Sequence, residues 1–535
     1  MMADLTLEPE TADLPGVAEE APHPGSQAMP RWNVGELPDA PKFRRRNWAM
    51  FLGPGLVSGA AAIGGGEWLT GPLVTARYGG ALLWLATLSI LAQVLYNIEI
   101  SRYTLYSGEP IFTGKFRVPP RPMFWVVVYI VLDFGSVLPY LASNAAVPLF
   151  AVIEGRLPDP AADVFALKAL ACAIFLIVLV PLVIGGKVYN SLKVLMTFKL
   201  VVVMGFLLFL AIGYSTAETW SEIFSGFVRF GTVPVASDDG PNVANVFRSV
   251  ASGTTMPPLD LSMVGVIAAM AAICGNGGLT NTPISSYTRD QGWGMGKYVG
   301  AIPSIVGGHE IELSHVGMVF HPTPESLPRW RRWLRHVQRE QLVVWMPAWF
   351  LGIALPSMLS VQFLARGTVP SDKWLAAGMT ADGVANAVGP TLGPLFWFLT
   401  LFCGFLVLST SLATGSDGFL RRWVDVFWTS SPRLRRWNPR HIGRLYFAVL
   451  CVYTVFGLTM LCLVDGGGLL VWATNLYNYA LGFSFWHTLL VNTTLLPPEL
   501  RPGLLRRFGL AMSGLFFIAI AVLTTLDSLG VFTSL

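Results

Sequence analysis

Charged side chains are scarce in this sequence of 535 residues. Asp, Glu, Lys and Arg together make up 13% of it, whereas 53% of the residues are hydrophobic and the mean hydropathy is +0.56. Ordinary soluble domains carry roughly a quarter of their residues as charged ones. The composition therefore excludes a soluble protein and indicates an integral membrane protein that crosses the bilayer many times.

Cysteines are also few, and none of them stands in a CxxC motif. All five lie within apolar runs of the sequence, at Cys172, Cys274, Cys403, Cys451 and Cys462. This spacing excludes a disulfide framework and a metal cluster held by several thiolates. We interpret most of these side chains as small hydrophobic groups of the core.

Other functional segments are missing as well. Residues 1–41 are rich in Pro, Ala and acidic residues and lack the apolar stretch of a secretory signal, so we expect a disordered cytoplasmic tail. The sequence has no phosphate-binding P-loop and no group of catalytic residues on one membrane face. We expect neither an enzyme nor an ATP-driven pump, with no cofactor and no nucleic-acid partner. The expected partners are the lipid bilayer and a small ion or solute.

Long apolar segments account for most of the chain. A helix needs about 20 such residues to cross the hydrocarbon core of a bilayer. The sequence predicts an all-α membrane protein with eleven transmembrane segments, at 48–77, 80–101, 122–152, 165–186, 190–213, 259–295, 341–362, 392–420, 442–464, 467–491 and 506–532.

The basic residues predict the orientation of these segments. With the N-terminus in the cytoplasm, 28 of the 36 Lys and Arg residues fall on the cytoplasmic side, as the positive-inside rule requires. An odd number of spans then places the C-terminus outside. We expect an integral protein of a bacterial inner or plasma membrane.

The first apolar segment contains a break in its helical pattern. Gly64, Gly65 and Gly66 stand together and are followed by Glu67. Each glycine destabilises a helix by about 1 kcal/mol relative to alanine, and unwound backbone inside a membrane is tolerated only within protein or beside a cavity. Gly64, Gly65 and Glu67 are therefore candidates for an ion or substrate site. The alternatives are a glycine surface for close helix packing and a carboxyl group satisfied by neighbouring amides.

The sixth segment is interrupted in the same way. Gly275, Gly277 and Gly278 disfavour a helix and Pro283 does not continue one. Side chains at this interruption that are candidates for the site are Cys274, Asn276, Thr280 and Asn281. Interrupted helices five segments apart are typical of two inverted repeats of five helices that bind their cargo where the interruptions meet.

This pattern predicts the organisation of the domains. After the tail, the first repeat occupies residues 42–213 and an external loop occupies 214–258. The second repeat occupies 259–491, and residues 492–535 form a cytoplasmic loop and an eleventh helix.

A few ionisable groups lie inside the apolar segments. Asp133 is a candidate for a proton path, with a structural hydrogen bond as the alternative. His487 is either a group of that path or an interfacial anchor. Lys199 is interpreted as a side chain that extends to the inner interface, with a role in coupling as the alternative. Asp417 is expected to pair with Arg421.

Two amides of the tenth segment complete the candidate site. Asn475 and Asn478 are three residues apart and share one helical face, which is a candidate lining of the cavity.

Several motifs resemble one known family. The GPG motif at 53–55 and the GEWLT motif at 66–70 resemble the first helix of the Nramp divalent-metal transporters, where the pattern is GPG, then DPGNW and a Thr. Asp133 and the following FGSVLPYLASNA resemble the third helix, in which an aspartate belongs to the proton path. Residues 409–418, STSLATGSDG, resemble the Ser/Thr-Gly pattern of the eighth helix and add Ser409 to the candidate site. The resemblance implies a LeuT-type fold and transport of a divalent metal.

The sequence departs from this family at the metal site. Gly64 stands where the family has its metal-binding aspartate, and Glu67 stands where it has an asparagine. The MPH motif of the sixth helix is replaced by CGNG at 274–277. Without the thioether, the remaining oxygen ligands, chiefly Glu67 and Asn276, suit a hard cation such as Mg²⁺ or Mn²⁺.

These observations lead to one main hypothesis and two alternatives. We expect a secondary active transporter of a divalent cation that works by alternating access, with Glu67, Asp133 and His487 on the proton path. The first alternative is a transporter of an amino acid or another small organic solute coupled to Na⁺ or H⁺, because free backbone N–H groups at a helix break bind a carboxylate well. The second is a membrane sensor without transport activity.

Overall fold

The computed structural model describes residues 21–41, 64–184, 188–237, 240–299, 316–435, 437 and 442–531. The expected first span, 48–77, is therefore described only from Gly64 onward. The structure is largely helical, which confirms the fold class at this level. Four short strands accompany the helices: β1 (Asn33–Val34), β2 (Thr232–Val235), β3 (Asn242–Asn245) and β4 (Met318–Val319).

The first half of the chain forms nine α-helices within the described residues. They are α2 (Gly65–Tyr78), α3 (Trp84–Ser107), α4 (Ile111–Arg117), α5 (Pro122–Leu132), α6 (Tyr140–Glu154), α7 (Val164–Ile184), α8 (Val188–Tyr214), α9 (Ala217–Gly226) and α10 (Val246–Ser252). The 3₁₀ turns η2 (Gly79–Leu82) and η3 (Asp133–Val137) connect α2 to α3 and α5 to α6.

The second half begins with two short helices that are separated by a non-helical segment. The α-helices are α11 (Val264–Ile273), α12 (Pro283–Asp290), α13 (Gly296–Val299), α14 (Ser326–Glu340), α15 (Met346–Phe363), α16 (Ala381–Val388), α17 (Gly393–Ser430), α18 (Pro432–Arg435), α19 (Ile442–Leu463), α20 (Gly466–Thr494) and α21 (Leu504–Ser528). The π turn η4 (Gln341–Trp345) joins α14 to α15, and the 3₁₀ turns are η5 (Lys373–Ala377) and η7 (Pro498–Leu500).

Six helical segments of the described chain are long and apolar enough to cross a membrane, and a seventh is added if α2 with η2 and α3, bent by 94°, is counted as one span. This confirms an integral membrane protein, although the number is lower than the eleven expected. Two of the expected spans differ from a long and uniformly apolar helix. Helix α11 has only ten residues, and α20 carries Asn475, Asn478 and His487 among its apolar side chains.

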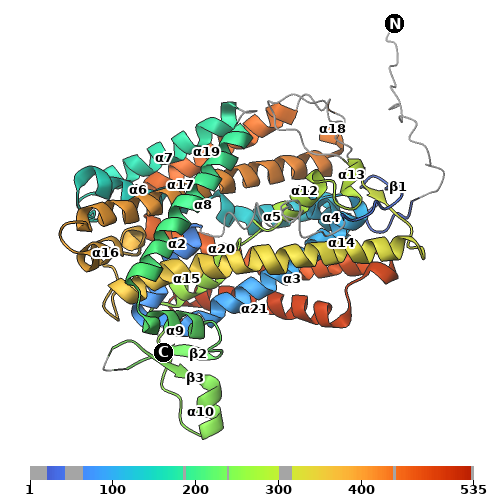
Figure 1. The fold of residues 1–535 in the computed structure, drawn as a ribbon. Helices are drawn as coiled ribbons and strands as arrows, with labels where there is room; N and C mark the ends of the chain where they lie inside the picture. Colours follow the sequence, from blue (N-terminus) through green and yellow to red (C-terminus); the bar gives the residue numbers. More distant parts are fainter. Residues whose placement is uncertain are drawn as a thin grey trace.

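The long helices lie side by side in one bundle (Figure 1). Helix α17 packs against α6, α7, α8 and α19, whereas α20 packs against α3, α11 and α21. Helix α2 lies between α15 and α11. One end of the bundle carries β1, α4 and α13, and the opposite end carries α9, β2 and α16 (Figure 1).

Residues 21–41 are ordered against the bundle, which corrects the expectation of a disordered tail for this part of it. Strand β1 pairs in parallel with β4, and the side chains of Met29, Trp32 and Leu37 are buried. The Trp32 ring lies 4.7 Å from the guanidinium carbon of Arg117 and contacts the ring of Tyr106. In the sequence these three apolar side chains stand among many Pro and acidic residues, and that composition led to the expectation of disorder. Residues 1–20 lie outside the described part.

Helix α14 lies against the protein at the same end. Its Trp330 and Trp333 are 2% and 3% exposed, and their rings contact Phe320 and Trp293. Helix α14, in which arginines are interspersed with tryptophans, thus packs on the protein through its aromatic face. Its Arg332 remains half exposed beside Asp39.

Candidate functional site

The centre of the candidate site is the non-helical segment 274–282 between α11 and α12. Gly275, Gly277 and Gly278 have φ values of +115°, +64° and +53°, which lie in the left-handed region. Other residues adopt this region at a cost, so the three glycines let the chain leave the helix here. Pro283 then begins α12 in the first helical turn, where its missing N–H breaks no hydrogen bond.

Gln93 of α3 forms hydrogen bonds with this segment through both the nitrogen and the oxygen of its side-chain amide. Its Nε2 donates to the Cys274 carbonyl at 2.9 Å. Its Oε1 accepts from the backbone N–H of Asn276 and from Nδ2 of Asn281, each at 2.9 Å. Ser89, one turn earlier, donates to the carbonyls of Ala271 and Cys274. Unpaired backbone groups in a buried site are costly, and these two side chains satisfy them.

Glu67 lies at the start of α2. Gly64 is extended, α2 begins at Gly65, and the Glu67 Oε2 accepts a hydrogen bond of 3.0 Å from the Gly64 backbone N–H. The side chain is 1% exposed, and its Oε1 has no partner of ordinary hydrogen-bond geometry among the described residues. The Gly275 backbone N–H is nevertheless close enough to stabilise the carboxylate. Glu67 thus both caps its own helix and faces the non-helical segment.

The glycines of the first break also provide close packing. A Cβ on Gly66 would lie 2.6 Å from the Ile273 side chain, and one on Gly65 would overlap with Leu141. The alternative of close helix packing therefore applies to this glycine cluster: α2 approaches α11 closely, and the same approach brings Glu67 beside the end of α11.

Lys199 of α8 is an ionisable neighbour of this site, although the sequence favours a side chain that extends to the inner interface. It is 1% exposed rather than extended to an interface, and it interacts electrostatically with Glu67. Cys274 and Tyr140 also lie within electrostatic range of the Glu67 carboxyl group. A buried base and a buried acid therefore lie within electrostatic range of each other.

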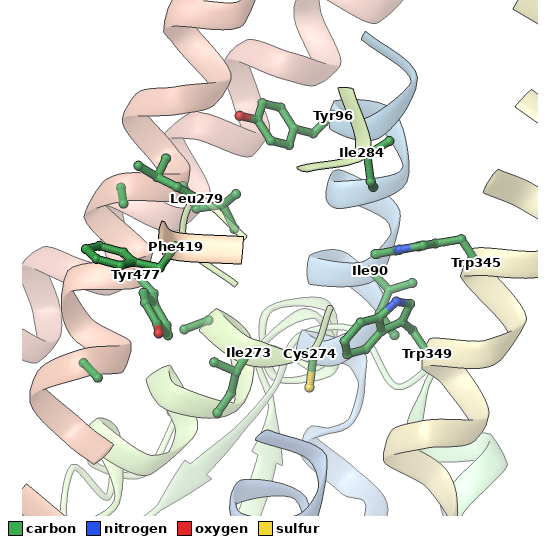
Figure 2. Close-up of a cluster of buried hydrophobic side chains, with 14 of the residues drawn as sticks. Ile90, Tyr96, Ile273, Cys274, Leu279, Ile284, Trp345, Trp349, Phe419 and Tyr477 are labelled. Carbon is green, nitrogen blue, oxygen red and sulfur yellow. The ribbon is translucent and has the colours of Figure 1, made fainter. Parts of the chain in front are cut away.

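The remaining polar groups of the segment are engaged locally. The Thr280 hydroxyl donates to the carbonyls of Gly277 and Asn276. The side-chain oxygen of Asn281 has no partner among the described residues, and the residue is fully buried. Apolar side chains surround the segment, with Ile90 and Trp349 on one side and Phe419 and Tyr477 on the other (Figure 2).

Asp133 forms a separate buried cluster. Its Oδ2 accepts from the Arg422 guanidinium at 2.6 Å and from the Trp423 indole at 2.7 Å, and its Oδ1 accepts from Ser136. Arg422 also donates to the Leu279 carbonyl at 3.0 Å. This arginine, which the sequence reasoning did not single out, therefore connects Asp133 to the non-helical segment.

The two asparagines of α20 contact different neighbours. Asn475 donates to Thr525 of α21 at 3.0 Å, and Asn478 donates to the Ala268 carbonyl of α11 at 3.2 Å. Only Asn478 thus points to the helix that leads into the break. Its side-chain oxygen has no partner among the described residues.

Ser409 and His487 lie in different surroundings. The Ser409 hydroxyl donates to the Phe405 carbonyl of its own helix at 2.7 Å. The Nδ1 of His487 lies 2.9 Å from the Tyr129 hydroxyl, and its ring stacks on Tyr129 and contacts Trp125. His487 is 3% exposed and therefore lies inside the protein.

Among the described residues, no three His, Cys, Asp or Glu side chains are close enough together to hold one metal ion. Within this part of the chain the candidate site offers one carboxylate, amide groups and backbone carbonyls. Such a set supplies oxygen ligands for a hard cation that keeps some of its water.

Comparison with known proteins adds to this geometry. The sequence matches no protein-family model. It is 30% identical over 122 residues to the divalent metal cation transporter MntH of Chromohalobacter salexigens. The structure superposes on that of the Eremococcus coleocola manganese transporter with a TM-score of 0.54 and 14% sequence identity, over 92% of this chain and 88% of that one. The same transporter matches equally well in a second crystal structure. The chain thus resembles Nramp transporters in part of its sequence and in its fold.

The two similarities differ in what they cover. The sequence match spans 22% of this chain and 28% of MntH, whereas the structural match spans nearly the whole fold. The resemblance to Nramp transporters is thereby confirmed, and both relatives are transporters rather than enzymes. Gln93 and Arg422, which form hydrogen bonds with the non-helical segment, belong to none of the motifs that carried the resemblance.

Proposed function

We propose that this Nramp-related chain is a secondary active transporter whose cargo is a divalent cation of the Mg²⁺ or Mn²⁺ type. The observation that carries this proposal is the place of Glu67, a buried carboxylate at the start of α2 that faces the non-helical segment 274–282. Its Oε1 accepts no hydrogen bond of ordinary geometry from the described residues, and Asn276 of the same segment is the proposed second oxygen donor. The names of the relatives, a divalent metal cation transporter and a manganese transporter, support the same class of cargo.

The mechanism that we propose is alternating access within two five-helix inverted repeats, 42–213 and 259–491. Helix α2 and the pair α11 and α12 would then be the interrupted helices, with the cargo between them. Protons would be exchanged along Glu67, Asp133 and His487, each of which is buried in the bundle. The hydrogen bond from Arg422 to Leu279 supports this route, because it connects Asp133 with the segment beside the cargo.

We further propose that the chain lies in a bacterial inner or plasma membrane with its N-terminus in the cytoplasm and its C-terminus outside. The end of the bundle that carries β1 and the basic helix α14 would face the cytoplasm, and the end with α9 and β2 would face outward (Figure 1). The excess of basic residues at the α14 end supports this orientation.

Uptake of Mn²⁺ and Mg²⁺ into proteoliposomes tests the cargo. Glu67→Gln should reduce uptake at least tenfold, because it removes the one carboxylate at the site while preserving the side-chain shape. Glu154→Gln, at an exposed acid that ends α6, is the matched control and should transport like the wild type. Uptake of both metals at the wild-type rate by Glu67→Gln would rule out the proposed site.

One observation favours an organic solute as a second candidate cargo. Lys199 is a buried base within electrostatic range of Glu67, and the backbone N–H groups at the start of α2 suit a carboxylate ligand. Thermal-shift measurements with metals and with amino acids in parallel would separate the two classes. Stabilisation by an amino acid and by no metal would select the organic cargo.

A further inference from the structure

Lys115 lies in the interior of the protein at the end of the bundle that carries α4. The side chain is fully buried, although α4 lies between two of the expected spans, 80–101 and 122–152. Its ammonium nitrogen contacts the Ser484 hydroxyl of α20 and lies 3.4 Å from the Tyr96 hydroxyl of α3. In Figure 2, Tyr96 extends from α3 into the interior of the bundle.

Aromatic rings form the rest of the surroundings of Lys115. The nitrogen lies 4.9 Å from the ring centre of Tyr129, 5.4 Å from that of Phe112 and 5.8 Å from that of Tyr96. Rings of this kind attract a cation through their faces, but this attraction replaces only part of the hydration that an ammonium group loses on burial.

No carboxylate compensates the charge of Lys115. Among the described residues, no acid lies within ion-pair distance of its nitrogen, and its hydrogen-bond partners are neutral hydroxyls. The charged or titratable groups that face it are Arg422 from α17, His487 from α20, Tyr129 from α5 and Tyr96 from α3. Two of these four carry or can gain positive charge, so the surroundings disfavour the ammonium form.

These surroundings change the protonation of the amine. Burial, together with the charge of Arg422, holds the pKa of Lys115 well below its ordinary value. In water a lysine has a pKa of about 10.4 and is charged at neutral pH. Hydration of this end of the bundle therefore favours uptake of a proton.

We propose that Lys115 is a proton-binding site that is empty while this end of the bundle is closed and is filled when the end opens to water. Opening converts the amine and one proton from the adjacent solvent into an ammonium group, and closing returns that proton. The site is separate from Glu67 and Asp133. It does not depend on the identity of the cargo.

Hydrogen exchange of the full-length protein in detergent, without metal or solute, tests this site. The exchange rate of the α4 backbone amides, corrected for the intrinsic dependence of amide exchange on pH, measures how often this end of the bundle opens. In the wild type, each unit of pH decrease between pH 9 and pH 7 should increase opening up to tenfold, as expected for uptake of one proton. In Lys115→Gln this slope should disappear, whereas Lys297→Gln, at an exposed lysine of α13 at the same end of the bundle, should retain it.

A slope that persists in Lys115→Gln, or one that disappears in Lys297→Gln alone, would overturn the proposal. If Lys115→Gln fails to fold, Ser484→Ala takes its place, because it keeps the amine and removes its closest hydroxyl. This variant should retain the slope, but the pH at which opening stops changing with pH should shift. An unshifted pH would equally overturn the proposal. Since no cargo is present, the result is independent of the proposed transport function.

Discussion

Asp133 and Arg422 form a buried ion pair, with 2.6 Å between Oδ2 of the acid and Nη2 of the base. The pair joins the 3₁₀ turn before α6 to the end of α17, and the same arginine donates to the Leu279 carbonyl. Removal of one partner of a buried pair leaves the other charge without compensation, which costs more than the pair contributes. The pair therefore positions three separate segments whether or not Asp133 also exchanges protons.

Asp133→Asn should lower the free energy of unfolding by about 3 kcal/mol, because it leaves the Arg422 charge buried and unpaired. Trp423→Phe, which removes one hydrogen bond to the same carboxylate, should cost about 1 kcal/mol. Denaturant unfolding in detergent, followed by circular dichroism, measures both. An equal effect of the two variants would contradict the importance of the ion pair.

Gln93 is expected to be the residue on which the non-helical segment depends most. Gln93→Leu leaves the Cys274 carbonyl, the Asn276 N–H and the Asn281 side chain without their partner. Each unsatisfied buried group costs about 1–3 kcal/mol, so residues 274–282 should exchange their backbone hydrogens at least tenfold faster. Hydrogen exchange read by mass spectrometry measures this effect.

Ser89→Ala is the matched control for the Gln93 variant. It removes one hydroxyl from the same helix face and should have a smaller effect on the segment, because Gln93 still binds the Cys274 carbonyl. Unchanged exchange of 274–282 in Gln93→Leu would show that the segment is held by other contacts.

Local patterns in the sequence predicted the features that depend on neighbouring residues. The glycines and Pro283 predicted the end of α11 and the start of α12. The spacing of Asp417 and Arg421 predicted their ion pair, which forms at 2.9 Å. These interactions are local in the chain, and helical geometry alone brings such residues together.

Features that depend on contacts between distant segments were not predictable in this way. Gln93 lies 183 residues before Asn276, and nothing in an apolar helix marks the glutamine that will meet a break elsewhere. Of the adjacent residues Arg421 and Arg422, only the fold determines which one reaches Asp133. Likewise Asn475 was expected to share a cavity with Asn478, but the packing of α21 provides its partner.

Gly66 should tolerate no side chain, because α2 approaches Ile273 of α11 closely at this position. Gly66→Ala should destabilise the protein by about 1–3 kcal/mol, as overpacking of a dense interior does. Ile273→Ala in the same molecule should restore part of that loss. A melting curve for the single and double variants gives the interaction between the two positions.

Gly205 of α8 provides the control for this experiment, because a Cβ there meets nothing within 4 Å. Gly205→Ala should stabilise α8 by up to about 1 kcal/mol through its higher helix propensity. If the Gly66→Ala protein were as stable as the Gly205→Ala protein, the inference that α2 closely approaches α11 would be wrong.

Trp32 should hold residues 21–41 against the bundle more strongly than the ion pairs of the same segment do. Its buried ring contacts Arg117 and Tyr106, whereas Glu36 is 78% exposed in its pair with Arg329. Loss of a buried tryptophan costs about 3–5 kcal/mol, but an exposed ion pair contributes about 0.2–1 kcal/mol. Trp32→Ala should therefore accelerate trypsin cleavage after Arg31 by at least tenfold, and Glu36→Gln by less than about fivefold. Cleavage is followed on gels with the full-length protein in detergent, and cleavage of Trp32→Ala at the wild-type rate would show that Trp32 does not hold the segment.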